Sequence, residues 1–92
     1  MAAPAGNAWN LARNGTDAVA TYVGPPPAGA NWQAQFRPVG EAAWQPGGGD
    51  TLEAALTATF NPWPEGGVEA RVRYTDDQGQ ALSDWSQTKP LA

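Results

Sequence analysis

The stretch that most constrains the fold is residues 68–75, where apolar and polar side chains alternate with a period of two. Successive side chains of a β-strand point to opposite faces, so the pattern predicts a strand with one buried and one solvent-facing side. The buried side is expected to hold Val68, Ala70, Val72 and Tyr74, and the solvent side Glu69, Arg71, Arg73 and Thr75. The turn-forming residues 76–79 then lead to a predicted return strand through residues 83–86.

Other segments show strand patterns separated by turn signals. Strands are predicted at residues 8–13, 16–23 and 31–37, with a short one around Trp44. Asn14-Gly15 predicts a type I′ hairpin turn between the first two strands, because both residues tolerate the positive φ that this turn needs. Proline and glycine cluster at residues 24–29, 46–49 and 61–67, which predicts loops there.

Residues 51–60 fit two structures. As a helix, the segment would be capped by Asp50, with Glu53 in its first turn. As a strand, it would place five apolar side chains on one face, namely Leu52, Ala54, Leu56, Ala58 and Phe60. We predict a strand, because the β-branched second half is poor helix material. The chain as a whole is then expected to be an all-β, antiparallel β-sandwich of about seven strands, since no helical crossovers are available for parallel pairing.

Composition narrows the possible chemistry. The chain has 92 residues, which is the size of one domain, and we expect an arm at residues 1–7 followed by a single domain at residues 8–92. It contains no cysteine and no histidine, so thiolate metal sites and the commonest general base are absent. The net charge is −4 and the five basic residues are dispersed, which argues against binding to nucleic acid or to an anionic membrane.

The N-terminal residues lack the basic and apolar regions of a signal peptide. No apolar run approaches the length of a transmembrane helix. We therefore expect the protein to remain soluble in the compartment in which it is made.

Several segments together carry a family resemblance. Residues 20–26 form a strand that ends in Tyr22 and prolines, and residues 32–37 alternate aromatic and small side chains before Arg37. With the strand at 68–73 and the turn leading to Trp85-Ser86, these segments resemble a fibronectin type III domain over about residues 8–90. The resemblance implies an immunoglobulin-like sandwich.

Two positions depart from that family pattern. Val68 stands where the family usually has a tyrosine, and Pro90 lies in a brief last strand, which suits only a sheet edge. These departures leave open a looser immunoglobulin-like sandwich of different topology.

The same resemblance suggests a role for the outer face of the 68–75 strand. Type III domains of cytokine receptors carry a ladder of stacked arginine and tryptophan side chains, and Ser83-Asp84-Trp85-Ser86 resembles half of the sequence motif that builds it. Arg71 and Arg73 are therefore predicted to stack on Trp85 as a structural brace rather than as a ligand site.

The acidic residues Asp76, Asp77 and Asp84 lie close together along the chain. Their spacing matches no calcium loop, and acidic turn residues ordinarily bond to their own backbone. No nucleophile with a base, phosphate loop or metal-ligand cluster is recognisable in the sequence. We therefore predict no cofactor, no metal and no enzymatic activity.

Five tryptophans among 92 residues are the most unusual feature of the composition. Core-facing alanines leave volume that Trp32 and Trp9 are expected to fill. The other aromatic and proline side chains without an assigned packing role are candidate partner contacts, namely Trp44, Trp63, Pro25, Pro26 and Pro27. The triple proline has a competing interpretation as a stiff loop.

These features favour a non-enzymatic structural or interaction module. We expect a decoration or accessory protein of a bacteriophage or phage-like particle, located in the virion and bound to a capsid or tail protein. That expectation uses fold-level analogy, because phages employ such domains on their particles. The alternative is a carbohydrate-binding or spacer module of a larger secreted or surface protein, in which Trp44 and Trp63 would bind a surface glycan.

Overall fold

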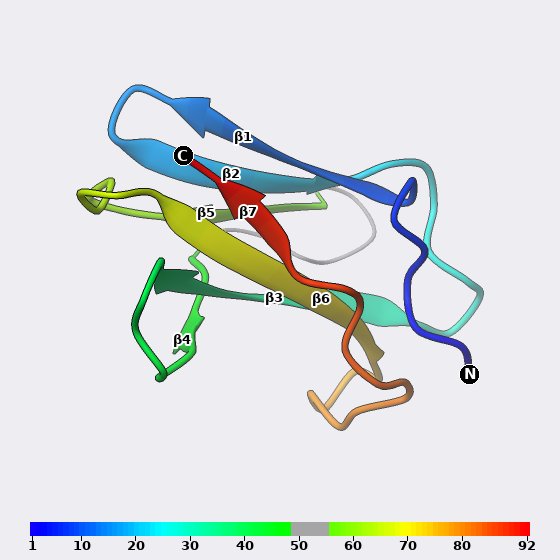
Figure 1. Cartoon of the computed structure of the whole chain (residues 1–92). Helices are drawn as coiled ribbons and strands as arrows, with labels where there is room; N and C mark the ends of the chain where they lie inside the picture. The colour runs from blue at the N-terminus through cyan, green and yellow to red at the C-terminus, as the bar shows by residue number, and fades with distance from the viewer. Residues whose placement is uncertain (49–55) are drawn as a thin grey trace.

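The computed structural model describes residues 1–48 and 56–92, and the chain there is all-β (Figure 1). Its strands form two antiparallel sheets, a three-stranded sheet of order β1-β2-β5 and a four-stranded sheet of order β4-β3-β6-β7. The strands are β1 (Trp9–Asn14), β2 (Asp17–Tyr22), β3 (Asn31–Pro38), β4 (Gln45–Pro46), β5 (Thr57–Phe60), β6 (Val68–Thr75) and β7 (Lys89–Leu91). The described residues contain no helix long and apolar enough to cross a membrane. The prediction of an antiparallel, sandwich-like all-β architecture is confirmed.

The centre of the four-stranded sheet is the pair β3 and β6. The two strands pair along their full lengths, from Asn31 opposite Thr75 to Pro38 opposite Val68. As predicted, the inner face of β6 is buried along Val68, Ala70, Val72 and Tyr74. The prediction for Thr75 is wrong, because this residue is buried with 4% of its surface exposed. The alternation of β6 therefore stops one residue before the strand ends.

The core is built from a few large rings set among alanines. Trp9 on β1 and Trp32 on β3 are buried as predicted, with 0% and 1% exposure, and Phe36 on β3 is also fully buried. The small side chains between these rings are Ala18, Ala20, Ala34, Ala58 and Ala70, all buried. Small and large residues thus share the volume between the sheets, which lets them approach the density of a native interior.

A pair of tyrosines connects the sheets at one end of this core. The hydroxyl groups of Tyr22, on β2, and Tyr74, on β6, lie 2.5 Å apart and form a buried hydrogen bond. Each polar group therefore has a partner away from water, which avoids the cost of an unpaired buried hydroxyl. Burial, followed by the bond to Tyr22, raises the pKa of Tyr74 to about 12.

The first hairpin differs from its prediction by one residue. Asn14 pairs with Asp17, so the central turn residues are Gly15 and Thr16 rather than Asn14 and Gly15. Gly15 has a φ of 63°, whereas Thr16 does not have a positive φ. A glycine with positive φ at the first central position only is typical of a type II′ turn, not type I′.

Two further strand predictions need correction. The strand predicted at residues 51–60 is present at 57–60, whereas its part at 51–55 lies outside the described residues. The return strand predicted at residues 83–86 is not a regular strand; β7 begins at Lys89. The segment 82–86 still runs alongside β6, because the backbone N–H groups of Leu82 and Ser86 donate hydrogen bonds to the carbonyls of Tyr74 and Val72.

The N-terminal arm is attached to the sandwich. Pro4 is buried, and the Lys89 ammonium donates hydrogen bonds of 2.6 Å each to the carbonyl oxygens of Gly6 and Trp9. The same ammonium lies 4.5 Å from the centre of the Trp9 ring. Lys89 therefore connects the C-terminal strand to the start of the chain.

Candidate interaction surfaces

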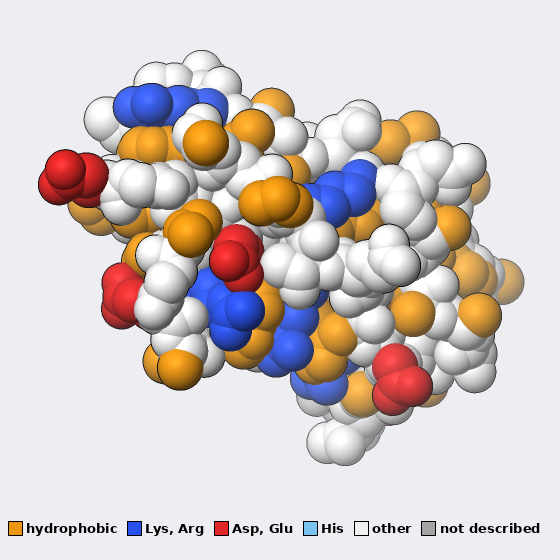
Figure 2. All heavy atoms as spheres, in the orientation of Figure 1, with side chains coloured by type: hydrophobic (Ala, Val, Ile, Leu, Met, Phe, Trp, Pro, Cys, Tyr) orange, Lys and Arg blue, Asp and Glu red, His pale blue; other side chains and the backbone are white. Residues whose placement is uncertain are grey.

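The outer face of the four-stranded sheet carries a continuous arginine–tryptophan ladder. Its order is Arg37, Trp44, Arg71, Trp85 and Arg73, and consecutive members are 4.2, 4.3, 4.2 and 4.3 Å apart from guanidinium carbon to ring centre. Figure 2 shows Lys and Arg side chains interleaved with hydrophobic ones across this face. The ladder is longer than the predicted set, because Arg37 and Trp44 extend it by two members.

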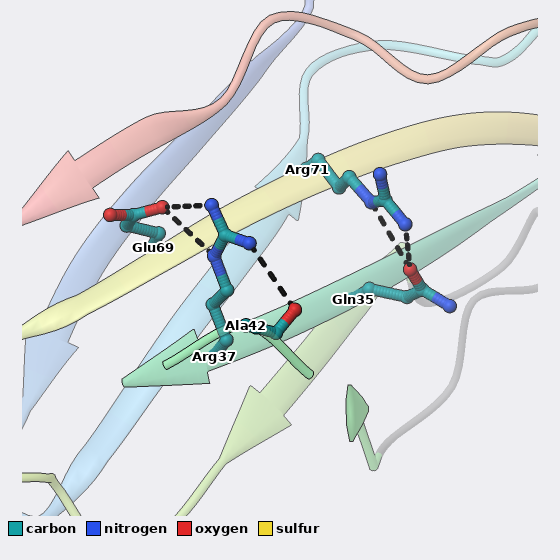
Figure 3. Close-up of polar contacts among 5 residues, drawn as sticks. All are labelled: Gln35, Arg37, Ala42, Glu69 and Arg71. Carbon is teal, nitrogen blue, oxygen red and sulfur yellow. Dashed lines mark hydrogen bonds and ion pairs between the residues drawn. The ribbon is translucent and has the colours of Figure 1, made fainter. Parts of the chain in front are cut away.

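Polar side chains on the two central strands orient the guanidinium groups. Arg71 donates two hydrogen bonds, of 3.1 and 2.7 Å, to the amide oxygen of Gln35 directly opposite on β3 (Figure 3). Arg73 donates one of 2.8 Å to Gln33 in the same way. Arg37 forms an ion pair of 2.9 Å with Glu69 on β6 and also donates to the carbonyl of Ala42. Cross-strand pairing thus fixes the spacing of the cations.

The tryptophans enter the ladder from opposite edges of the four-stranded sheet. Trp44 comes from the segment before β4, and Trp85 from the segment that precedes β7. The latter segment is held by two serines, since Ser83 and Ser86 accept hydrogen bonds of 3.0 Å from the backbone N–H groups of Tyr74 and Val72. These side-chain acceptors replace carbonyls that a regular strand would supply.

The ladder is positively charged and only partly neutralised. Three guanidinium groups share the face, and the ion pair found within it is the one to Glu69. Desolvation by burial lowers the pKa of Arg71, and repulsion by Arg37 and Arg73 lowers it further. The guanidinium remains charged at neutral pH because the ordinary pKa of arginine lies far above 7. Stacking on indole rings partly offsets this repulsion.

The predicted contact tryptophans occupy separate places. Trp44 is half-buried and stacked against two guanidinium groups, so a sugar ring would have to compete for faces already in use. Trp63 is also half-buried, packs against the core, and has the guanidinium of Arg13 at 4.5 Å from its ring centre. The geometry does not favour the two rings as a joint sugar-binding platform.

The predicted proline contacts lie at one end of the sandwich, which we call the loop end. It consists of residues 23–30, between β2 and β3, and residues 76–82, after β6. Pro25 and Pro27 are exposed there and Pro26 is half-buried. The loops are connected by a hydrogen bond of 3.1 Å from the Asn31 amide to an Asp77 carboxylate oxygen.

Apolar side chains at the loop end are unusually exposed for their size. Val23 has 52% of its surface exposed and Leu82 has 37%. The N-terminal segment reaches the same end, because the carbonyl of Ala8 accepts a hydrogen bond from the backbone of Val23. With the proline loop, these residues give the loop end exposed apolar side chains. Val39, with 45% of its surface exposed, lies outside this end.

The acidic residues of the turn have structural contacts. One Asp76 oxygen accepts hydrogen bonds of 2.9 Å from the backbone N–H groups of Gln78 and Gln80, as expected of a turn residue. Within residues 1–48 and 56–92, no group of three or more His, Cys, Asp or Glu side chains is placed to hold a metal ion.

Sequence reasoning named these residues but did not place Arg37 and Trp44 in the ladder, and it assigned no hydrogen bonds to Ser83 and Ser86. A usable signal existed for the serines, because they flank Trp85 with a spacing of three residues. Trp44 had no local signal, because it reaches Arg71 only across the sheet.

Comparison with known proteins adds no relative. No protein-family model matches the chain significantly, and neither does any curated protein or solved structure.

Proposed function

We propose that this chain is a non-enzymatic interaction module with a fibronectin type III-like sandwich, and that it binds a protein partner through the loop end. The strand orders β1-β2-β5 and β4-β3-β6-β7 support that fold type, as does the Arg–Trp ladder. In this proposal the ladder is a brace, and the binding surface lies elsewhere.

The observation that carries the proposal is the concentration of Val23, Leu82 and the triple proline at one end. Exposed apolar side chains with rigid proline neighbours lose little conformational entropy on binding, which favours a protein interface. The hydrogen bond between Asn31 and Asp77, which joins the two loops, adds to this pre-organisation.

The sheet edges support the same choice of surface. On β1, the Trp9 carbonyl accepts a hydrogen bond from the Lys89 ammonium. On β5, Thr59 exchanges two backbone hydrogen bonds with Gly48. The other edge strands contain prolines, Pro46 in β4 and Pro90 in β7. Edges with lysine, proline or covering segments resist pairing with another chain, so recognition is assigned to loops rather than to strand addition.

We assign the partner to a larger assembly, specifically a capsid or tail protein of a bacteriophage or phage-like particle. This part of the proposal is supported by fold-level analogy alone. It predicts that the chain is recovered in the virion.

A photo-cross-linking experiment tests the proposed docking. A photoreactive amino acid replaces Pro27 at the loop end or, as a matched control, the exposed Glu65 near the opposite end of β6, and both variants are made in the source organism. We expect one discrete adduct from position 27, none from position 65, and its recovery with the assembled particle. Adducts from position 65 alone, or none from position 27, would refute docking through the loop end.

A further inference from the structure

The loop end contains a small hollow. Residues 26–31 and Asp77 line a space of about 130 Å³ between the two loops. Pockets for drug-sized ligands are usually about 300–1,000 Å³, so this space suits one side chain rather than a whole small molecule. Its position places any occupant between the proline loop and the turn after β6.

The hollow has an acidic wall without a basic neighbour in the loops. One oxygen of the Asp77 carboxylate accepts the hydrogen bond from Asn31. The other accepts none from the residues that the structure describes, and residues 23–31 and 76–82 contain no lysine or arginine. The adjacent Asp76 increases the negative charge, and its carboxylate is already used by the turn.

The rest of the lining is mostly polar, with a smaller apolar part, and Pro26 and Pro27 are among the residues that form it. Lysine and arginine side chains combine an apolar stem with a charged head, and guanidinium can bond to a carboxylate and a carbonyl together.

We infer that the hollow receives a lysine or arginine side chain of the protein partner, with Asp77 as its counter-ion. The inference rests on the proposed docking through the loop end and specifies the chemistry of the partner. The net charge of −4 favours the same choice, because it attracts a basic surface during encounter.

A titration followed by NMR tests this inference with defined probes. The probes are N-acetyl-arginine amide and N-acetyl-lysine amide, and the neutral control is N-acetyl-citrulline amide, which has nearly the shape of the arginine probe. We expect saturable amide shifts confined to residues 28–31 and 77 with the charged probes, and at least fivefold weaker binding of citrulline. Equal shifts with citrulline would overturn the inference.

Matched variants separate the hollow from general electrostatics. D77N is expected to weaken arginine binding at least fivefold, and E65Q, which removes the same charge at a distant exposed site, is expected to leave it unchanged. Added salt should weaken binding to the wild-type protein more than to D77N. Equal losses in D77N and E65Q would contradict a specific site.

The two proposals fail differently. If cross-linking at position 27 succeeds but the charged probes do not bind, the loop end docks without a basic anchor in the hollow. If the probes bind but position 27 gives no adduct, the hollow recognises a cation and the proposed docking is wrong.

Discussion

Trp85 is the residue whose contacts most affect the outer face. Its ring lies between Arg71 and Arg73 in the ladder, at 4.2 and 4.3 Å from their guanidinium carbons. Each such contact is worth about 0.5–1 kcal/mol at an exposed site. Loss of this ring would also leave the two cations without the group that separates them.

We expect Trp85→Ala to lower the free energy of unfolding by about 1–2 kcal/mol, the sum of two stacking contacts. Urea denaturation of the single variants W85A and R73M and of the double variant measures the coupling directly. A coupling energy of about 0.5–1 kcal/mol is expected for the Arg73–Trp85 pair. Additive losses would show that the stack is not a brace.

Tyr74 provides a pH-dependent contribution to stability. Its pKa is raised from 10.0 to about 12, so the folded protein prefers the neutral phenol more strongly than the unfolded chain does. The stabilisation is fully present below the unfolded pKa of 10.0 and is lost progressively as the pH rises toward about 12.

Urea midpoints measured from neutral pH to about pH 12 therefore test the Tyr22–Tyr74 pair. The wild-type midpoint should fall through this alkaline range, and that of Tyr74→Phe, which has no phenol at this position, should fall less. Parallel curves for the two proteins would mean that another group controls the alkaline loss of stability.

Among the elements, the junction between the β5–β6 loop and β6 lies close against the C-terminal residues. Gly66 and Gly67 both have positive φ, of 91° and 98°. A Cβ at Gly66 would meet open space, whereas one at Gly67 would collide with the carbonyl of Leu91 and the Cα of Ala92. The second glycine thus permits the C-terminal residues to approach β6.

The two glycines form a matched pair for mutation. Gly66→Ala should cost about 1 kcal/mol, the penalty for a side chain in a glycine conformation. Gly67→Ala should cost about 1–3 kcal/mol more, because it adds overpacking against β7. Urea denaturation of both variants measures the difference. Equal losses would indicate that β7 shifts freely and that its pairing with Val68 contributes little.

Whole-element predictions succeeded where the sequence signal is local. The period of two in residues 68–74 identifies the buried face of β6 because neighbouring side chains alone define it. The predicted hairpin register was wrong by one residue, because Asn14-Gly15 and Gly15-Thr16 are both compatible with a two-residue turn. The prediction for Thr75 was wrong because burial at the end of β6 depends on the turn that follows, in which Ala81 forms a β-bridge with Thr75.

At the scale of the molecule, the ladder and the loop end depend on contacts between distant segments. Trp44 was predicted as a partner contact, yet it stacks on Arg71 of β6, which is separated from β4 by β3 in the sheet. The hydrogen bond between Asn31 and Asp77 joins residues 46 positions apart. Such contacts follow from sheet pairing, so composition and local pattern could not specify them.

We propose that the loop end is the surface that a partner covers. Amide hydrogen exchange, measured on the isolated chain and on the chain within its assembly, tests this proposal. Residues 23–30 and 76–82 should exchange more slowly in the assembly, while the ladder segments around Trp44 and Trp85 remain unchanged. Protection confined to the ladder face, with the two loops unaffected, would contradict the claim.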